Sequence, residues 1–518
     1  MKLKIEKKYL TFPVNTQTSL KRVTFKNEAD ALIYDLECKL DAIEPNFTAY
    51  VDVSRFMGMT LSIDTAPYME FEIGATDEYP SDTVYNDDIR PKIHFTVKNG
   101  WNNDPNGLVK MNGKYHMFYQ YNPCSAEWGN MHWGHAVSTD MLHWEEKDYA
   151  LFPDRFGTMY SGSAIVDKNG DCPIGDGKSP KMLLYYTAAT NNLMSRGQSY
   201  TQRLAYSEDG VNFTKYDSSP MVDFIEGGNR DPKVIWVDEL SAYVLILYLD
   251  GNRFAMFKST DLLNWERFQD ITLPSDRECP DLFPLSCEGD KLWIIIGASD
   301  FYIVGKFVNG KFIEINKEKR LSHGGVNYAA QSFSGIDDNR TVRIYWQRTH
   351  IPSPTFTQQM SIPVQMSLTR EKNGYFLHAL PIKELEALRT DTVTKTNITL
   401  NSQLNLNVEC SPLDITLETE YKTDSVITLS IFGTSVRIDM KNNVAVMLRD
   451  KAPLSLKKDS VKLRVIVDRC TLELFTDDGR YLLTTQQLWD RNLPYITLST
   501  NVPLEIKELT VHSLKSIH

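Results

Sequence analysis

Short runs in which apolar and polar residues alternate occupy both ends of the chain. They lie at residues 22–25, 47–53 and 69–73 near the amino end, and at 463–468 and 471–475 near the carboxyl end. Alternation with a period of two places the apolar side chains on one face of a half-buried strand. The pattern predicts a small N-terminal β domain over residues 1–74. Over residues 397–518 it predicts a β-sandwich, which suits a segment of that length.

Between these ends, one pattern of strands returns several times. Each copy opens with a turn that leads into an apolar strand, and the copies start near residues 104, 161, 231, 280 and 327. Repeats of roughly 50 residues that contain several strands each are typical of propeller blades. We therefore expect an all-β protein in which a five-bladed β-propeller over residues 93–380 precedes the C-terminal β-sandwich.

The first three copies share an ending, Ser-x-Asp-x-x-x-Trp/Phe, which begins at Ser138, Ser207 and Ser259. This ending predicts a hairpin turn whose aromatic residue packs between blades. Residues 75–92 are rich in Asp, Glu, Pro and Ser, which is typical of a linker. Residues 381–389 begin with Pro and space their apolar residues by three. They predict a short connecting helix, and we expect helix and linker together to span 381–396.

Composition and charge narrow the class of partner. The chain has 56 Lys and Arg against 67 Asp and Glu, a net charge of −11. An acidic protein has no electrostatic reason to bind nucleic acid or an anionic membrane, and no stretch reaches transmembrane length. The amino end lacks the apolar run of a signal peptide. We therefore expect a cytoplasmic protein, with secretion open if a leader was removed.

The sequence gives no sign of a metal centre. Seven scattered cysteines without a CxxC pair indicate neither a zinc site nor a disulfide framework. His132 and His135 are three residues apart on a predicted strand, so they point to opposite faces and are poorly placed to share a metal. We expect neither a metal nor another cofactor.

Three acidic residues share one setting. Asp104, Asp231 and Glu278 each lie at a Pro-containing turn where a strand of a different copy begins. The innermost strands of a propeller line its axis, so their starts meet at one mouth of the channel. We therefore expect these acids to meet. The alternative is that each caps its own turn, which explains one acid well but three poorly, because clustered like charges cost energy.

Carboxylates beside aromatic residues are what glycoside cleavage requires. One carboxylate attacks the anomeric carbon, and one carboxylic acid protonates the departing oxygen. The tryptophans that offer stacking faces are Trp101, Trp128, Trp133 and Trp346. The candidates for hydrogen bonds to a sugar are Asn103, Gln120, Tyr160, Ser161 and Arg230. For any single tryptophan, packing between blades explains the residue equally well. For any single polar residue, ordinary hydrogen bonding in a turn or at a strand end does so.

Four ordered motifs carry a resemblance to a known family. They are Trp-Asn-Asn-Asp-Pro-Asn-Gly at 101–107, Tyr-Ser-Gly-Ser at 160–163, Arg-Asp-Pro at 230–232 and Glu-Cys-Pro at 278–280. In this order and spacing they resemble glycoside hydrolase family 32, the invertases, levanases and inulinases. The resemblance covers roughly residues 90 to 518, which leaves the first domain outside it.

The resemblance implies a retaining mechanism. Asp104 would be the nucleophile, Glu278 the acid and then the base, and Asp231 the group that holds fructose hydroxyls and stabilises the transition state. The matches to family positions around the bound fructose are Asn103, Gln120, Trp128, Ser161 and Arg230, with Trp346 a weaker match.

Two residues depart from the family pattern. Asn102 stands where the family usually has an apolar residue, and Asn327 stands where it often has Asp. We include Asn327 among the substrate-binding candidates, at the rim of the pocket. A lost charge there alters substrate contacts more than the chemistry.

These observations lead to one hypothesis and its rivals. We expect an exo-acting β-fructosidase that takes fructose from fructans, fructo-oligosaccharides or sucrose, because a dead-end funnel admits one terminal sugar. A fructosyltransferase with the same site and a non-catalytic carbohydrate-binding protein are the alternatives. A propeller that cleaves arabinose or xylose polymers is disfavoured by the motifs. The sequence does not indicate the preferred linkage, the chain length of the substrate or the oligomeric state.

Overall fold

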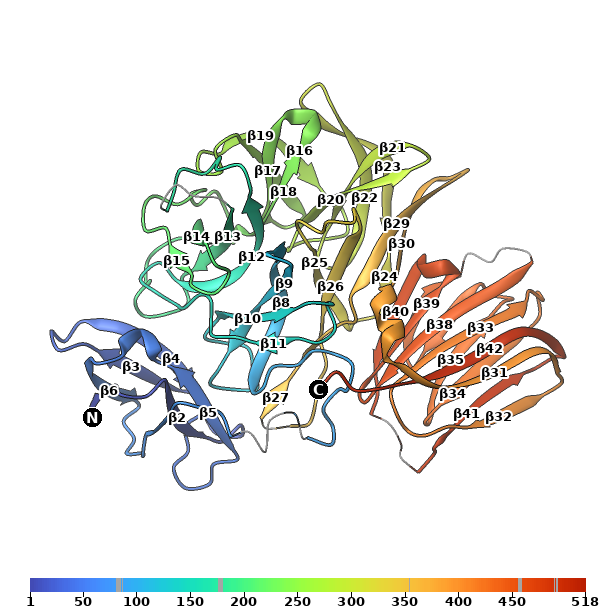
Figure 1. The fold of residues 1–518 in the computed structure, drawn as a ribbon, viewed down its shortest axis with the longest axis horizontal. Coiled ribbons are helices and arrows are strands. Elements are labelled where there is room, and N and C mark those ends of the chain that lie inside the picture. Colours follow the sequence, from blue (N-terminus) through green and yellow to red (C-terminus); the bar gives the residue numbers. More distant parts are fainter. Residues whose placement is uncertain are drawn as a thin grey trace.

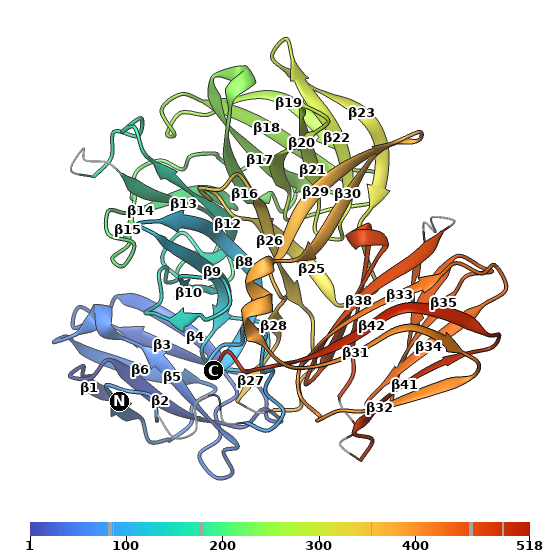
Figure 2. The same cartoon turned by 45° about the vertical axis from the view of Figure 1, so that its right-hand side comes forward.

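The computed structural model describes residues 1–80, 85, 87–175, 180–353, 355–454, 459–488, 490 and 492–518. Within them the chain is almost entirely β-strand and forms three parts (Figure 1). A small N-terminal domain lies beside the first blades of a central ring of sheets, and a sandwich lies beside the last blades. The view in Figure 2 gives the same arrangement. No helix in the described part of the chain is long and apolar enough to span a membrane.

The N-terminal domain consists of two sheets that face each other. One sheet has the order β1 (Lys2–Lys4), β6 (Thr60–Ala66), β3 (Lys21–Lys26) and β4 (Leu32–Cys38). The other has the order β5 (Phe47–Asp52), β2 (Tyr9–Val14) and β7 (Gly74–Thr76), and η1 (Ser54–Phe56) is a short 3₁₀ turn. Phe12, Phe25 and Leu36 are fully buried in the core between them. Cys124 of the ring belongs to the same apolar cluster, so the two parts share a core.

Five sheets of the described residues form the ring, in chain order. Blade 1 has β8 (Gly100–Met111), β9 (Lys114–Asn122), β10 (His132–Ser138) and β11 (Glu145–Glu146); blade 2 has β12 (Thr158–Asp167), β13 (Lys181–Ala189), β14 (Thr201–Ser207) and β15 (Thr214–Lys215). Blade 3 has β16 (Arg230–Val237), β17 (Ala242–Asp250), β18 (Arg253–Ser259) and β19 (Glu266–Thr272), with η2 (Asp238–Leu240) between its first two strands. Blade 4 has β20 (Asp281–Cys287), β21 (Asp290–Ile296), β22 (Phe301–Val308) and β23 (Lys311–Arg320). Blade 5 has β25 (Asn327–Ser332), β26 (Thr341–Gln347), β29 (Val364–Glu371) and β30 (Gly374–Pro381), with β28 (Gln359–Met360) paired to β26.

The first strand of each blade lies at the centre of the ring. Strands β8, β12, β16, β20 and β25 contact one another in that order, and β25 returns to β8. The ring is closed by β27 (Phe356–Thr357), which pairs in parallel with the start of β8, while Thr355 accepts a 2.7 Å hydrogen bond from Gly100 N. The structure therefore confirms the predicted five-bladed propeller.

The repeated Ser-x-Asp ending forms the predicted turn. In the first copy the Ser138 hydroxyl donates to Asp140 over 3.0 Å, and the same carboxylate accepts 2.9 Å bonds from the next backbone amides. The other two copies repeat this pattern. The aromatic residue at the end packs against a neighbouring blade, as Trp265 does edge-on to Tyr185 at 5.8 Å.

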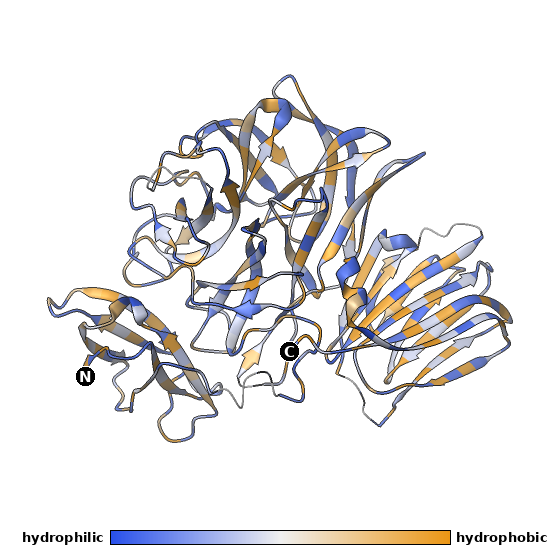
Figure 3. Ribbon diagram, in the orientation of Figure 1, coloured by the Kyte–Doolittle hydropathy of each residue, from blue (hydrophilic) through white to orange (hydrophobic). Residues whose placement is uncertain are grey.

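The C-terminal part is a sandwich of two sheets. The first sheet has the order β24 (Ser322–His323), β40 (Tyr481–Gln486), β39 (Thr471–Thr476), β38 (Ser460–Asp468), β33 (Leu413–Glu420), β42 (Leu504–Leu514) and β31 (Arg389–Leu400). The second has the order β32 (Gln403–Asn407), β41 (Tyr495–Thr500), β34 (Val426–Ile431), β35 (Thr434–Asp439), β36 (Val444–Met447) and β37 (Asp450–Pro453), and η4 (Asp477–Gly479) is a 3₁₀ turn. Hydrophobic and hydrophilic residues alternate along these strands in Figure 3, as the sequence predicts.

Two predicted boundaries differ from the observed elements. The connecting helix is the 3₁₀ helix η3 (Lys383–Leu388), but β31 follows it directly and occupies residues assigned to the linker. Strand β31 is an exposed edge strand whose side chains over 390–397 are polar except for Val393, so it lacks the apolar alternation that marks a strand. Strand β7 likewise enters the predicted linker 75–92, of which residues 81–84 and 86 lie outside the described residues.

Candidate functional site

The inner strands are irregular at one end. In four of the five blades the first strand carries a shift of register there, between Asn102 and Pro105, Tyr160 and Gly162, Arg230 and Lys233, and Tyr328 and Gln331. In blade 4 the equivalent point lies just before β20, where Glu278 and Cys279 have φ values of 56° and 40°. Bulges and left-handed residues re-aim side chains at the end of a sheet. Here they surround the axis of the ring.

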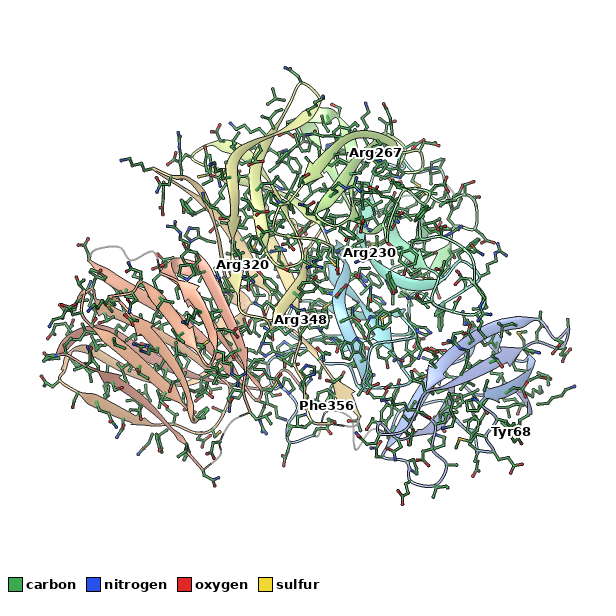
Figure 4. All side chains as sticks on the ribbon, turned by 180° about the vertical axis from the view of Figure 1, so that it is seen from behind. Tyr68, Arg230, Arg267, Arg320, Arg348 and Phe356 are labelled. Atoms are coloured by element: carbon green, nitrogen blue, oxygen red, sulfur yellow. The ribbon has the colours of Figure 1, made fainter. Side chains whose placement is uncertain are left out.

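The sequence-predicted acids line one cavity at this end of the ring. Its volume is about 610 Å³, and its walls come from blades 1, 2, 3, 4 and 5. The lining residues are Asn103, Asp104, Gln120, Trp128, Tyr160, Tyr200, Gly227, Gly228, Arg230, Asp231, Glu278, Tyr328 and Trp346. Figure 4 shows Arg230 near the middle of the ring, whereas Arg267 lies towards its outer edge. The structure thus brings Asp104, Asp231 and Glu278 together from three blades.

One arginine and one cysteine connect the three acids. Arg230 lies 3.2 Å from Glu278 and 3.6 Å from Asp231, so one guanidinium faces both carboxylates. The backbone N–H of Cys279 donates to Asp231 over 3.0 Å. The Cys279 thiol lies 3.4 Å from the same oxygen and 3.6 Å from Asp104. The acids therefore form one electrostatic unit, with the Arg230 guanidinium beside two of them.

Burial and the repulsion between neighbouring carboxylates raise the pKa values of Asp104 and Asp231. For Asp104, burial raises the pKa, and the hydrogen bond from Ser161 acts in the opposite direction. For Asp231, burial is the largest cause, Arg230 opposes it, and the charges of Asp104 and Glu278 add to it, so that the pKa rises to about 7. Asp104 and Asp231 therefore titrate as a coupled pair.

A chain of hydrogen bonds leads to Asp104. Trp101 Nε1 donates to the Asn103 side chain over 2.8 Å, and Asn103 Nδ2 donates to Gln120 over 3.0 Å. Gln120 Nε2 in turn donates to the Ser161 hydroxyl over 2.7 Å, and Ser161 donates to Asp104 Oδ2 over 2.6 Å. Each donor fixes the orientation of the next acceptor. The Oδ2 oxygen of Asp104 is therefore held in a fixed orientation.

Aromatic rings form the walls above the acids. Trp128 is 51% exposed and lies edge-on to Tyr160 at 6.0 Å, and Tyr160 lies edge-on to Tyr200 at 5.7 Å. On another wall Tyr328 contacts Trp346 at 6.1 Å. Sequence reasoning missed Tyr200 and Tyr328. The signal for Tyr328 was present, because it follows the predicted start of the fifth copy directly, whereas Tyr200 lies in a loop without a motif.

The structure does not bring Asn327 to the cavity, and its assignment to the rim needs correction. Its side chain is buried, donates to Ser322 over 3.3 Å and accepts from Gln347 over 3.2 Å. Successive side chains of a strand point to opposite faces, so Tyr328 faces the cavity and Asn327 faces away from it.

Two further tryptophans lie outside the lining. Trp133 is fully buried, donates to the Tyr160 carbonyl over 3.0 Å and packs between blades 1 and 2 against Tyr186. Trp101 supports the hydrogen-bonded chain and lies edge-on to Trp346 at 6.0 Å. Trp133 therefore packs between blades and Trp101 supports the hydrogen-bonded chain. Neither presents a free face on which a sugar could stack.

The remaining sequence observations have structural roles. Asn102 is buried, and within the described residues its amide has no hydrogen-bond partner, which is unusual for a polar side chain. His132 bonds to Tyr34 of the N-terminal domain at 2.6 Å, whereas His135 bonds to His116 at 3.0 Å. No group of three or more His, Cys, Asp or Glu side chains among the described residues is arranged to hold a metal ion.

The arrangement matches the needs of glycoside cleavage. Carboxyl groups held beside a cation and under aromatic walls can supply an attacking oxygen and a proton donor in one pocket. The aromatic rings provide faces for the apolar side of a sugar, and the amide and hydroxyl groups provide hydrogen bonds.

Comparison with known proteins places the chain among such enzymes. Residues 94–379 match the glycosyl hydrolases family 32 N-terminal domain, and residues 384–513 match the family 32 C-terminal domain. A levanase of Bacillus subtilis is 32% identical over 87% of this chain and 73% of its own length. An extracellular exo-inulinase of Aspergillus awamori is 28% identical over 78% of this chain and 90% of its own.

Solved structures agree in fold. The exo-inulinase of Aspergillus awamori superposes with a TM-score of 0.75 at 25% identity, covering 84% of this chain and all of that one. A fructofuranosidase of Schwanniomyces occidentalis, solved with fructose, gives 0.74 at 23% identity, covering 82% and 98%. Since the two family domains together span the propeller and the sandwich, the chain belongs to glycosyl hydrolase family 32.

Proposed function

We propose that this chain is a retaining exo-β-fructosidase that hydrolyses terminal β-D-fructofuranosyl residues of fructans, fructo-oligosaccharides or sucrose. The observation that carries the proposal is the single cavity in which Asp104, Asp231 and Glu278 meet beneath aromatic walls. The names of the relatives, levanase and exo-inulinase, support fructose-containing substrates.

In the first step Asp104 attacks the anomeric carbon of the terminal fructose. The bond to the leaving oxygen breaks, its electron pair goes to that oxygen, and Glu278 supplies the proton. The hydrogen bond from Ser161 holds the Asp104 carboxylate in place for attack. The Glu278 side chain is 28% exposed, against 6% for Asp231, so Glu278 is the acid nearer to the opening through which the leaving group departs.

In the second step the covalent fructosyl-enzyme is hydrolysed. Glu278, now a carboxylate, takes a proton from water, the water oxygen bonds to the anomeric carbon, and Asp104 is released. Asp231 holds fructose hydroxyls and stabilises the positive charge that develops on the ring. Arg230 faces both Glu278 and Asp231, so its positive charge stabilises their negative charge during the proton transfers.

A closed floor accounts for exo action. Further along the inner strands, Lys233 donates to the Ser332 carbonyl over 2.7 Å, and the Ser332 hydroxyl donates to Asp281 over 2.8 Å. Arg343 donates to the same Asp281 carboxylate over 3.2 Å. All four side chains are buried. We infer that this buried cluster closes the axis of the ring, so that a polymer enters the site by its end.

Product analysis on sucrose, inulin and levan, run beside Asp104→Asn, tests the proposal. We expect free fructose from the wild type at the earliest times, and a loss of about 10⁴-fold or more in turnover for the variant. The asparagine side chain has nearly the shape of the aspartate it replaces, so the melting temperature should stay close to that of the wild type. Near-wild-type rates in Asp104→Asn would contradict the nucleophile assignment, and oligosaccharides without free fructose would contradict exo cleavage. Products larger than sucrose would indicate transfer instead.

A further inference from the structure

The N-terminal domain contacts the loop that carries Trp128. This Trp128 loop, residues 123–131, connects β9 to β10. Lys39 forms an ion pair with Glu127 at 2.6 Å, on one side of Trp128. On the other side, the Asn130 amide accepts from the backbone N–H of Glu37 over 2.8 Å and donates to its carbonyl over 2.7 Å. Trp128 is therefore fastened to the N-terminal domain on both sides.

Asn130 holds the loop in a conformation of its own. Its φ is 46°, in the left-handed region that asparagine tolerates better than most residues. Its amide also donates to Asn122 over 3.0 Å, and Asn122 donates to the Glu127 carbonyl over 2.8 Å. The same asparagine thus joins the edge of β4 to the two ends of the Trp128 loop.

A second rim loop rests on the same strand. Residues 190–200 connect β13 to β14 and carry Tyr200, which lines the cavity. The carboxylate of Asp35 is fully buried, and each of its two oxygens lies 3.2 Å from the backbone nitrogen of Leu193, which donates to them. Asn191 of this loop donates to the Tyr160 hydroxyl. Strand β4 therefore supports both of the loops whose aromatic residues meet at Tyr160.

We propose that the N-terminal domain completes the outer wall of the substrate site, with Asn130 as the positioning residue that holds Trp128 against the sugar on the leaving-group side. The inference rests on the proposed function. The acids lie at the buried end of the cavity and Trp128 is half exposed at its opening, so a sugar beyond the terminal fructose lies beside Trp128. Because the Trp128 ring is already held in place, stacking on the sugar does not cost the entropy of ordering this side chain.

Kinetics of Asn130→Gly test this role. Glycine adopts a φ of 46° without strain, so the change removes the amide and leaves the backbone free to keep its path. We expect KM for a fructo-oligosaccharide to rise about fivefold to tenfold, as the loss of the two hydrogen bonds to Glu37 predicts, with kcat within about twofold. The matched control is Asn27→Gly, because the Asn27 side chain accepts from Ala29 and Ala31 of its own turn, and the change should leave both constants unaltered.

A double-variant cycle decides whether Asn130 acts through Trp128. In a Trp128→Ala background we expect Asn130→Gly to add nothing further to KM, because the ring that it positions is gone. An unchanged KM in Asn130→Gly, or an undiminished effect in the Trp128→Ala background, would overturn the proposal.

Hydrogen exchange keeps this test separate from the proposed function. In Asn130→Gly the backbone amides of residues 123–131 should exchange faster than in the wild type, whatever the activity. Unaltered exchange would refute the support from β4. A wild type that releases no fructose from any fructan but shows the faster exchange in the variant would refute the proposed function and leave the support in place.

Discussion

Ser161 is the last donor in the chain of hydrogen bonds that ends at Asp104, and its hydroxyl stabilises the charged form of that carboxylate. In Ser161→Ala this stabilisation is lost, so the pKa of Asp104, already raised by burial, rises further. The nucleophile must be ionised, so the acid limb of kcat/KM moves to higher pH. At the optimum kcat/KM should fall about 10-fold to 100-fold, the value of a hydrogen bond to a charged group.

A pH profile of kcat/KM measures this shift. Ser163→Ala is the matched control, because Ser163 lies two residues further along β12 and accepts only from Val234 N at 2.9 Å. An acid limb that stays in place in Ser161→Ala would show that Asp104 does not set it.

Single residues also show where sequence reasoning succeeds and where it stops. Asp104, Asp231 and Glu278 were predictable, because each is marked by a proline turn at the start of a repeat. The sequence predicts Asn327 at the rim, whereas Tyr328 lines the cavity. A shift of one residue along a strand moves a side chain to the opposite face. A repeat start defined only to within a residue cannot decide between them.

Strand β12 carries a bulge that aims Tyr160 and Ser161, and Gly162 makes this bulge possible. A Cβ at Gly162 would overlap the backbone carbonyl of Tyr185 on β13. We expect Gly162→Ala to separate the two strands, to lower stability by about 1–3 kcal/mol and to lower kcat/KM, because Ser161 moves with the bulge.

Melting temperature and initial rates together check the Gly162 prediction. Gly325→Ala is the control, since no atom lies within 4 Å of its added Cβ. A Gly162→Ala protein with wild-type activity and stability would mean that the bulge does not position Ser161.

At the level of strands, alternation predicted the blades and the sandwich because most of their strands have one buried face. It failed for the first part of β31, where residues 390–397 are exposed on both faces and all except Val393 are polar. The pairing of β31 with β42 supplies the hydrogen bonds that define the strand, and no side-chain pattern records it.

A buried histidine joins the propeller to the sandwich. His94 lies 2.8 Å from Asp468 and 2.7 Å from Glu473. Burial lowers the pKa of His94, but the two carboxylates raise it more, to about 9. The folded pKa lies above the unfolded value of about 6.5, so the charged histidine stabilises the fold fully below about pH 6.5. This stability is lost as the pH rises through about 9.

Melting temperatures of wild type and His94→Gln test this bridge, measured from about pH 6 to about pH 10 so that the range includes both pKa values. We expect the difference between the two proteins to be largest at the acidic end and to shrink towards the alkaline end. The exposed pair His143–Asp140 offers the control variant His143→Gln, which should show no such convergence. Parallel curves for wild type and His94→Gln would contradict the charged bridge.

Across the whole molecule, the number of blades and their order followed from the repeat. The support of the Trp128 loop by β4 did not, because Glu37 and Asn130 are far apart in the sequence and their bond involves the backbone of one partner. Contacts of this kind leave no residue pattern. They emerge only once separate segments of the chain have folded and lie side by side.

The closure of the ring by β27 has a consequence for folding during synthesis. Asp104 lies on β8 in the first blade, yet the start of β8 gains its second strand neighbour only when Phe356 and Thr357 arrive from the far end of the propeller. While the polypeptide is leaving the ribosome, the early blades therefore exist without a finished cavity. The cavity is complete only once the last blade, which contributes Tyr328 and Trp346 to its lining, has been synthesised.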